Sequence, residues 1–154
     1  MIYEFCAENV TLLEKAMQAG ARRIELCDNL AVGGTTPSYG VTKAAVELAV
    51  NYDTTIMTMI RPRGGDFVYN DLEIAIMLED IRLTAQAGSQ GVVFGALTAD
   101  KKLDKANLEK LIAASKGMEI VFHMAFDELS DVDQLEAIDW LSQAGVTRDR
   151  KSVV

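Results

Sequence analysis

Short apolar runs alternate with longer amphipathic stretches along this chain. The runs cover residues 2–6, 23–27, 55–60, 91–95 and 119–124, and their nearly continuous apolar character is typical of parallel strands buried on both faces. A stretch with helical periodicity follows each run. The clearest spans residues 71–87, where apolar side chains recur at spacings of three and four residues. The pattern predicts five consecutive βα units.

Local signals mark where the helices begin and end. Asn9 is expected to cap a first helix, and further helices are expected over about 41–51 and 105–116. Ser130 opens a last helix, which runs through Leu135, Ile138 and Leu141. Ala-Gly recurs at 19–20, 87–88 and 144–145, where a helix should stop and a strand begin. This repetition predicts an α/β fold, either a doubly wound open sheet or a (β/α)8 TIM barrel.

Composition narrows the classes of function. The 154 residues are 49% hydrophobic and 25% charged, which suits one globular core, and the net charge of −8 argues against binding to nucleic acid or to anionic lipid. The N-terminus lacks the layout of a signal peptide, and no apolar run approaches the roughly 18 residues that cross a membrane. We therefore expect a cytoplasmic protein whose two cysteines are free thiols.

Polar residues gather at the carboxyl ends of the expected strands, where barrels and open α/β sheets carry their sites. Glu25 and Cys27 share one face of a strand, as do Glu4 and Cys6. A carboxylate among apolar neighbours needs a partner, and arginine is the natural one. The two cysteines are either small buried hydrophobes or ligands for a soft metal such as Cu(I).

The segment Arg61-Pro62-Arg63-Gly64-Gly65-Asp66 places two arginines at the end of an apolar strand. Either both arginines pair with surface carboxylates such as Asp66, or they hold a carboxylate or phosphate ligand. In the second case the Gly33-Gly34 loop would add backbone donors.

His123 is the single histidine of the chain. It is either a satisfied core imidazole or a general acid/base, with Glu25 as a second proton-transfer group and Asp127 as the residue that orients the imidazole. The polar strand ends resemble those of barrel enzymes, although no reaction can be assigned from them.

Four motifs, ELCDNLAVGGTTPSYG (25–40), MIRPRGGDFVYN (59–70), GVVFGALTAD (91–100) and FHMAFDE (122–128), resemble the CutC family, named as copper homeostasis proteins. The resemblance implies a cytoplasmic (β/α)8-type barrel, assembled as a homo-oligomer and linked by name to copper. The family pattern falls on Glu25, Cys27, Asn29, Arg61, Arg63, Gly64, Gly65, Asp66, His123, Phe126 and Asp127. Met124 departs from it, since many members carry arginine there.

Two expectations follow from this resemblance. Because a barrel has eight units, residues 1–148 are expected to be the N-terminal part of a single barrel domain, with residues 149–154 as an atypical tail of foreign sequence. The expected function is cytoplasmic copper handling, with Cu(I) held by Cys6 and Cys27. The alternative is a barrel enzyme or binding protein for a small anionic metabolite, held by Arg61 and Arg63 with Asn29, Gly64, Gly65 and Asp66 nearby.

Overall fold

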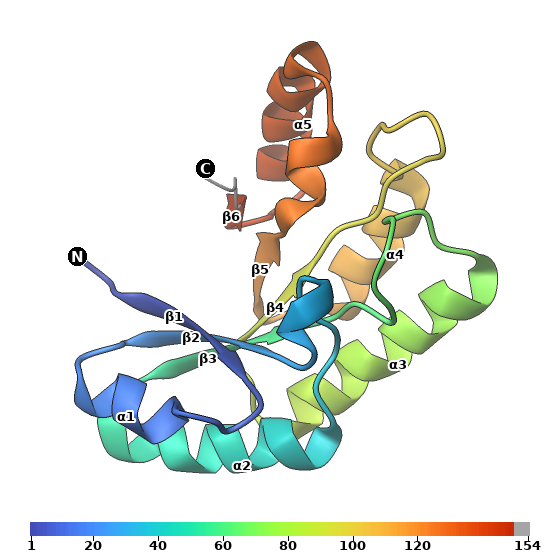
Figure 1. The fold of residues 1–154 in the computed structure, drawn as a ribbon. Coiled ribbons are helices and arrows are strands. Elements are labelled where there is room, and N and C mark those ends of the chain that lie inside the picture. Colours follow the sequence, from blue (N-terminus) through green and yellow to red (C-terminus); the bar gives the residue numbers. More distant parts are fainter. Residues whose placement is uncertain (150–154) are drawn as a thin grey trace.

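The computed structural model describes residues 1–149, so residues 150–154 of the expected tail lie outside the described part. The elements in chain order are β1 (Glu4–Glu8), α1 (Leu13–Gln18), β2 (Arg23–Cys27), η1 (Leu30–Val32), α2 (Tyr39–Ala49), η2 (Val50–Tyr52), β3 (Thr55–Met59), α3 (Asp71–Ala87), β4 (Gly91–Phe94), α4 (Lys105–Ala114), β5 (Glu119–Phe122), η3 (Met124–Glu128), α5 (Asp131–Gln143) and β6 (Arg148–Asp149) (Figure 1). None of the helices within residues 1–149 has both the length and the apolar character needed to cross a membrane.

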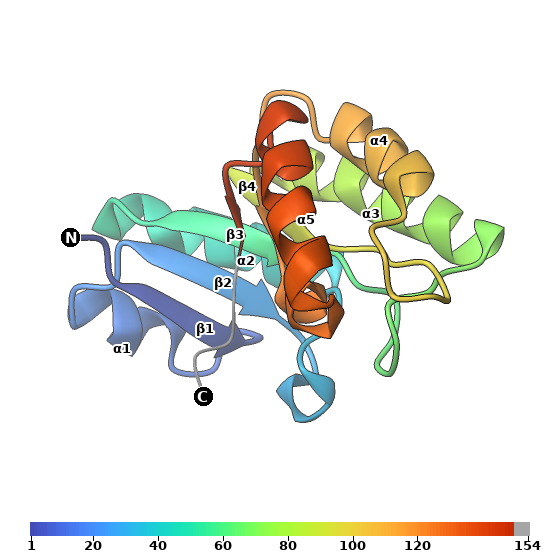
Figure 2. The ribbon, with the colours of Figure 1, turned by 90° about the horizontal axis from the view of Figure 1, so that it is seen from above.

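The strands form one parallel sheet in the order β1-β2-β3-β4-β5-β6, so every strand pairs with its neighbour in the sequence. The sheet curves strongly, and the helices lie along its convex side (Figures 1 and 2). Each helix therefore returns the chain to start the next parallel strand, which is the connection of a (β/α) barrel. The predicted α/β fold of TIM-barrel type, with an incomplete set of units, is confirmed.

A short sixth strand follows the five predicted βα units. Arg148 of β6 is the register partner of Val121 in β5, and the Arg148 Nη1 atom lies 3.0 Å from Glu4 Oε2 of β1. This ion pair links the two edge strands of the described sheet across its concave side. A carboxylate on a strand was expected to need an arginine partner, and for Glu4 this partner is Arg148.

The core has two layers, one on each side of the sheet. On the convex side, strand residues such as Ile24 and Phe94 pack under the helices, in two clusters of buried side chains. On the concave side a third cluster contains Cys27, Met57, Met59, Val93 and Val121, with Cys6 against it. Both faces of β2, β3, β4 and β5 are thus buried, as their continuous apolar runs predicted, whereas the edge strand β1 keeps Phe5 exposed.

The predicted starts of α3 and α5 are confirmed, whereas α2 begins at Tyr39, after its Ser38 cap, and not at about residue 41. The helix α3 spans the predicted residues 71–87, with a capping box in which Asn70 accepts from the Glu73 amide and Glu73 accepts from the Asn70 amide. It ends at Gly88, whose φ of 91° only glycine adopts easily. Ser130 caps α5 by accepting from the Asp133 amide, as predicted.

One local prediction was wrong. Asn9 does not cap α1, which begins after Leu12, because the Asn9 side chain instead donates to Asp28 Oδ1 at 2.9 Å. Leu135 and Ile138 are 69% and 46% exposed, since the sheet covers only the side of α5 that carries residues such as Leu141. The apolar residues thus identified the helix, but only some of them are buried.

Candidate functional site

Three side chains with metal-binding atoms meet on the concave side of β1 and β2. The Sγ atoms of Cys6 and Cys27 are 4.0 Å apart, and Glu25 Oε1 lies 3.7 Å from the first and 3.9 Å from the second. One ligand atom from each residue lies within 4.8 Å of the others. We call these three residues the thiol–carboxylate cluster.

Strand geometry explains why the three residues converge. Cys6 is the register partner of Glu25 in the parallel ladder, so their side chains stand next to each other on the same face. Cys27 follows Glu25 by two residues and therefore points to the same side of β2. The cluster is thus a consequence of one strand pairing.

The cluster is enclosed by apolar groups. Glu25 is 1% exposed and Cys27 is fully buried, while Cys6 is partly accessible. Met57 and Met59 of β3 pack against Cys27. A site with these neighbours has little water to compete for a bound ion, and Cys6 provides its open side.

A pair of glycines covers the cluster from the carboxyl end of the strands. A Cβ atom on Gly34 would lie 3.0 Å from Cys27 Sγ, and one on Gly33 would lie 2.9 Å from the terminal methyl of Met124. Both glycines have φ near 90°, a conformation that other residues rarely adopt. The loop therefore approaches the thiol more closely than any larger residue would allow.

Arg61 holds this loop in place. Its guanidinium donates to the carbonyls of Val32 at 2.7 Å, Gly34 at 2.9 Å and Gly65 at 2.9 Å. The side chain is 2% exposed and lies over the ring of Phe67, with 4.9 Å between the guanidinium carbon and the ring centroid. Arg61 thus joins the loop after β2 to the loop after β3.

Arg63 is bound by groups of its own loop and by a carboxylate from the first turn of α3. It pairs with Glu73 and with Asp66, and it also donates to the carbonyls of Gly64 and Val68. Its hydrogen bond to Glu73 raises the pKa of Arg63 and lowers that of Glu73. The ion pair between Arg63 and Asp66 is the surface pairing that the sequence analysis gave as the alternative to ligand binding.

His123 lies apart from the thiol–carboxylate cluster, at the end of β5. It is fully buried, its Nδ1 accepts from the Ala125 amide at 3.2 Å, and its ring centroid is 4.9 Å from that of Phe67. Because Nδ1 accepts, the neutral ring carries its proton on Nε2. Asp127, expected to orient the imidazole, is an exposed residue of η3.

Comparison with known proteins identifies the family. A model of the CutC family matches residues 1–151. The chain belongs to the CutC family. A CutC family protein of Enterococcus faecalis is 54% identical over 148 residues, which cover 96% of this chain and 71% of the relative, and one of Bacteroides thetaiotaomicron is 40% identical, with 95% and 57% covered. The chain thus spans between about half and three quarters of the length of these CutC relatives.

Solved structures agree with this assignment. The crystal structure of CutC from Streptococcus agalactiae, which its name assigns provisionally to copper homeostasis, is 49% identical with a TM-score of 0.93, over 97% of this chain and 71% of that one. A phosphonomutase-like protein of Burkholderia cenocepacia has a TM-score of 0.70 at 16% identity, over 99% and 62%. The second likeness concerns the fold alone.

The CutC motifs therefore contribute to the site in different ways. Glu25 and Cys27 of the first motif join Cys6 in the cluster, whereas Asn29 is exposed and its carbonyl accepts from the Gly34 amide within the covering loop. A Cβ atom on Gly64 would lie 2.8 Å from that of Val32, so the second motif packs tightly against this loop. The motifs thus build the cluster and its cover together.

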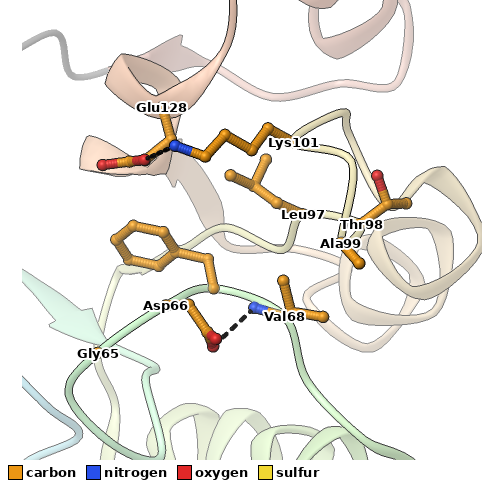
Figure 3. A pocket seen from close by; sticks show the side chains of 9 residues that line it. Gly65, Asp66, Val68, Leu97, Thr98, Ala99, Lys101 and Glu128 are labelled. Atoms are coloured by element: carbon orange, nitrogen blue, oxygen red, sulfur yellow. Dashed lines mark hydrogen bonds and ion pairs between the residues drawn. The ribbon is translucent and has the colours of Figure 1, made fainter.

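A pocket beside the second motif is lined by Gly65 and Asp66, which were expected near a ligand, and by residues that were not foreseen from the sequence. It lies among the loops after β3, β4 and β5, and Lys101 and Glu128 form an ion pair across it (Figure 3). All three loops follow carboxyl ends of strands, which was the available signal. Neither residue stands at a strand end, however, so reading the strand ends alone missed them.

Proposed function

We propose that this chain binds Cu(I) at the thiol–carboxylate cluster, as part of copper handling in the cytoplasm by a protein that is a homo-oligomer at full length. The observation that supports this is the 4.0 Å separation of the two Sγ atoms. With metal–thiolate bonds of roughly 2.3 Å, an S–metal–S angle of about 120° gives about this separation. Thiolates are ligands that select Cu(I) over hard cations.

Glu25 has a distinct part in this proposal. A metal binds thiolates, so each cysteine must lose its proton on binding. Glu25 Oε1 is within 4 Å of both sulfur atoms and is positioned to accept a proton from one of them, while the second proton leaves to solvent past the partly accessible Cys6. With Glu25 protonated, Cu(I) and two thiolates leave one net negative charge in the buried site, whereas an ionised Glu25 would leave two.

The contacts of Arg61 and Arg63 favour a role other than the anion binding considered above. The donors of Arg61 are directed at three backbone carbonyls, and those of Arg63 at carboxylates and carbonyls. We therefore propose that both arginines position the loops that cover the cluster. The name of the Streptococcus agalactiae relative refers to copper homeostasis, which agrees with copper as the bound metal in this proposal.

The test is an anaerobic titration of the reduced protein with Cu(I) in the presence of bicinchoninate, whose coloured complex reports the copper left unbound. We expect about one Cu(I) per chain, lost in both Cys6→Ser and Cys27→Ser. Glu25→Gln should bind with a changed pH dependence, because it cannot take up a proton.

Thr58→Ser is the matched control, since it alters a fully buried residue of β3 whose hydroxyl bonds Ser89 on the other side of the sheet. It should bind copper as the parent does. Circular dichroism confirms that each variant is folded. Equal Cu(I) uptake by folded Cys27→Ser would refute the proposal.

A further inference from the structure

A pocket of about 370 Å³ opens among the loops after β3, β4 and β5 (Figure 3). It is separate from the thiol–carboxylate cluster, because none of the three cluster residues lines it. Its size falls at the lower end of the range for small-molecule sites, about 300–1,000 Å³. The space suits a molecule of amino-acid size.

The floor of the pocket is apolar and firmly held. Phe67 and Leu97 are 8% and 3% exposed, and Val68 lies beside them. The Leu97 amide donates to the Phe67 carbonyl at 2.9 Å, which ties the loop after β4 to the loop after β3. Behind the pocket, Phe67 packs on Arg61 and His123. This floor would accept an aliphatic or aromatic group without rearrangement.

The rim carries two opposite charges, which pair with each other and could pair with a ligand instead. Lys101 Nζ lies 2.9 Å from Glu128 Oε2, and the two side chains are 67% and 49% exposed. An ion pair exposed to this extent contributes little to stability, so its two long side chains can separate at small cost. Asp66, also on the rim, is already neutralised by Arg63 and accepts from the Val68 amide. The exchangeable charges are therefore those of Lys101 and Glu128.

We propose that this pocket binds an α-amino acid with a large apolar side chain. The ligand carboxylate pairs with Lys101, the ligand ammonium group pairs with Glu128, and the side chain packs on Phe67 and Leu97. A zwitterion replaces both halves of the existing ion pair. A simple anion would leave Glu128 without a counter-charge in a protein of net charge −8, and a simple cation would do the same to Lys101.

The experiment is a titration of the isotope-labelled 154-residue protein with L-phenylalanine, followed by the amide resonances of the pocket loops. Phenylalaninamide, which lacks the carboxylate, and N-acetylphenylalanine, which lacks the ammonium group, are titrated in parallel. We expect saturable shifts with L-phenylalanine and binding at least about ten-fold weaker for each derivative, since each loses one charge-assisted contact.

Lys101→Gln and Glu128→Gln should each weaken L-phenylalanine binding about ten-fold by the same reasoning. Lys102→Gln is the control, because Lys102 is the adjacent lysine, faces Asp133 at 3.8 Å and does not line the pocket. Equal affinities for the three ligands, an equal loss in the control, or no saturable shift would each overturn the proposal. The cysteines are unchanged throughout, so the outcome is independent of the copper titration.

Discussion

Replacing Arg61 with methionine tests whether this arginine is a structural clamp. Methionine retains much of the apolar stem and removes the guanidinium, so the carbonyls of Val32, Gly34 and Gly65 lose a charged donor. The arginine is 2% exposed, and water therefore replaces it at those carbonyls only if the loops move apart. We expect a large loss of stability and a loosened cover over Cys27.

The size of the loss can be estimated from these contacts. A hydrogen bond from a charged donor contributes about 1.5–3 kcal/mol, so three independent bonds would amount to about 4.5–9 kcal/mol. The bonds are not independent, because the loops can relax together and regain water. The cost of removing one member of a buried charged arrangement, about 3–5 kcal/mol, is the better guide. That is a large share of the roughly 5–15 kcal/mol by which a domain is stable.

Urea unfolding followed by circular dichroism measures this loss. Arg61→Lys keeps the charge but not the planar fork, so it should fall between the parent and Arg61→Met, and it remains measurable if Arg61→Met does not fold. Arg82→Met is the control, since Arg82 is an exposed residue of α3 paired with Glu79, and it should change stability by less than about 0.5 kcal/mol. A loss below about 1 kcal/mol in Arg61→Met would show that the carbonyl contacts are not what holds the loops.

Three further predictions concern single groups. The hydrogen bond from Arg63 lowers the pKa of Glu73, so the ionised carboxylate stabilises the fold above pH 4.5, and this contribution is lost as the pH falls. In Glu73→Gln, the free energy of unfolding measured with urea should therefore decrease less steeply at acid pH than in the parent. An equally steep decrease would count against the pair. Burial raises the pKa of Tyr69 from 10.0 to about 12, so the stability of the fold should decrease as the pH rises between these values. Tyr69→Phe should remove the phenolate absorbance change near pH 12, and persistence of that change in the variant would exclude its assignment to Tyr69. Gly34→Ala should destabilise the fold more than Gly20→Ala. Both glycines have positive φ, but only a Cβ atom on Gly34 would lie 3.0 Å from the buried thiol of Cys27. Equal decreases in the melting temperature of the two variants would mean that this contact relaxes.

The βα pattern and the caps of α3 and α5 could be predicted because they depend on neighbours in the sequence. The capping box of α3 joins Asn70 to Glu73, three residues away, and the stop at Gly88 requires one residue type. The buried side of α5 could not be predicted in this way. Which side is covered depends on the curvature of the sheet, and Leu135 is as apolar as Leu141.

The candidate site shows the same division. The sequence placed Glu25 and Cys27 on one face of a strand, because alternation is local. Cys6 was expected to share a metal with Cys27, but whether the two side chains meet depends on the register between β1 and β2, which residue types alone do not set. The expected arginine partner for a strand carboxylate was found for Glu4, through Arg148, on a strand too polar to be recognised.

The sequence pattern by itself determined the order of the elements and the face that carries Glu25 and Cys27. The sequence motifs determined the family and, through it, the choice of a barrel over an open sheet. The tertiary structure decided that Cys6 stands 4.0 Å from Cys27 and that the donors of Arg61 go to backbone carbonyls. The physical reason is that periodicity can be recognised from which residues are apolar and which are polar, whereas every residue has the same backbone carbonyl acceptor. Which carbonyls an arginine meets therefore has no signature in the sequence and follows from how the loops are brought together.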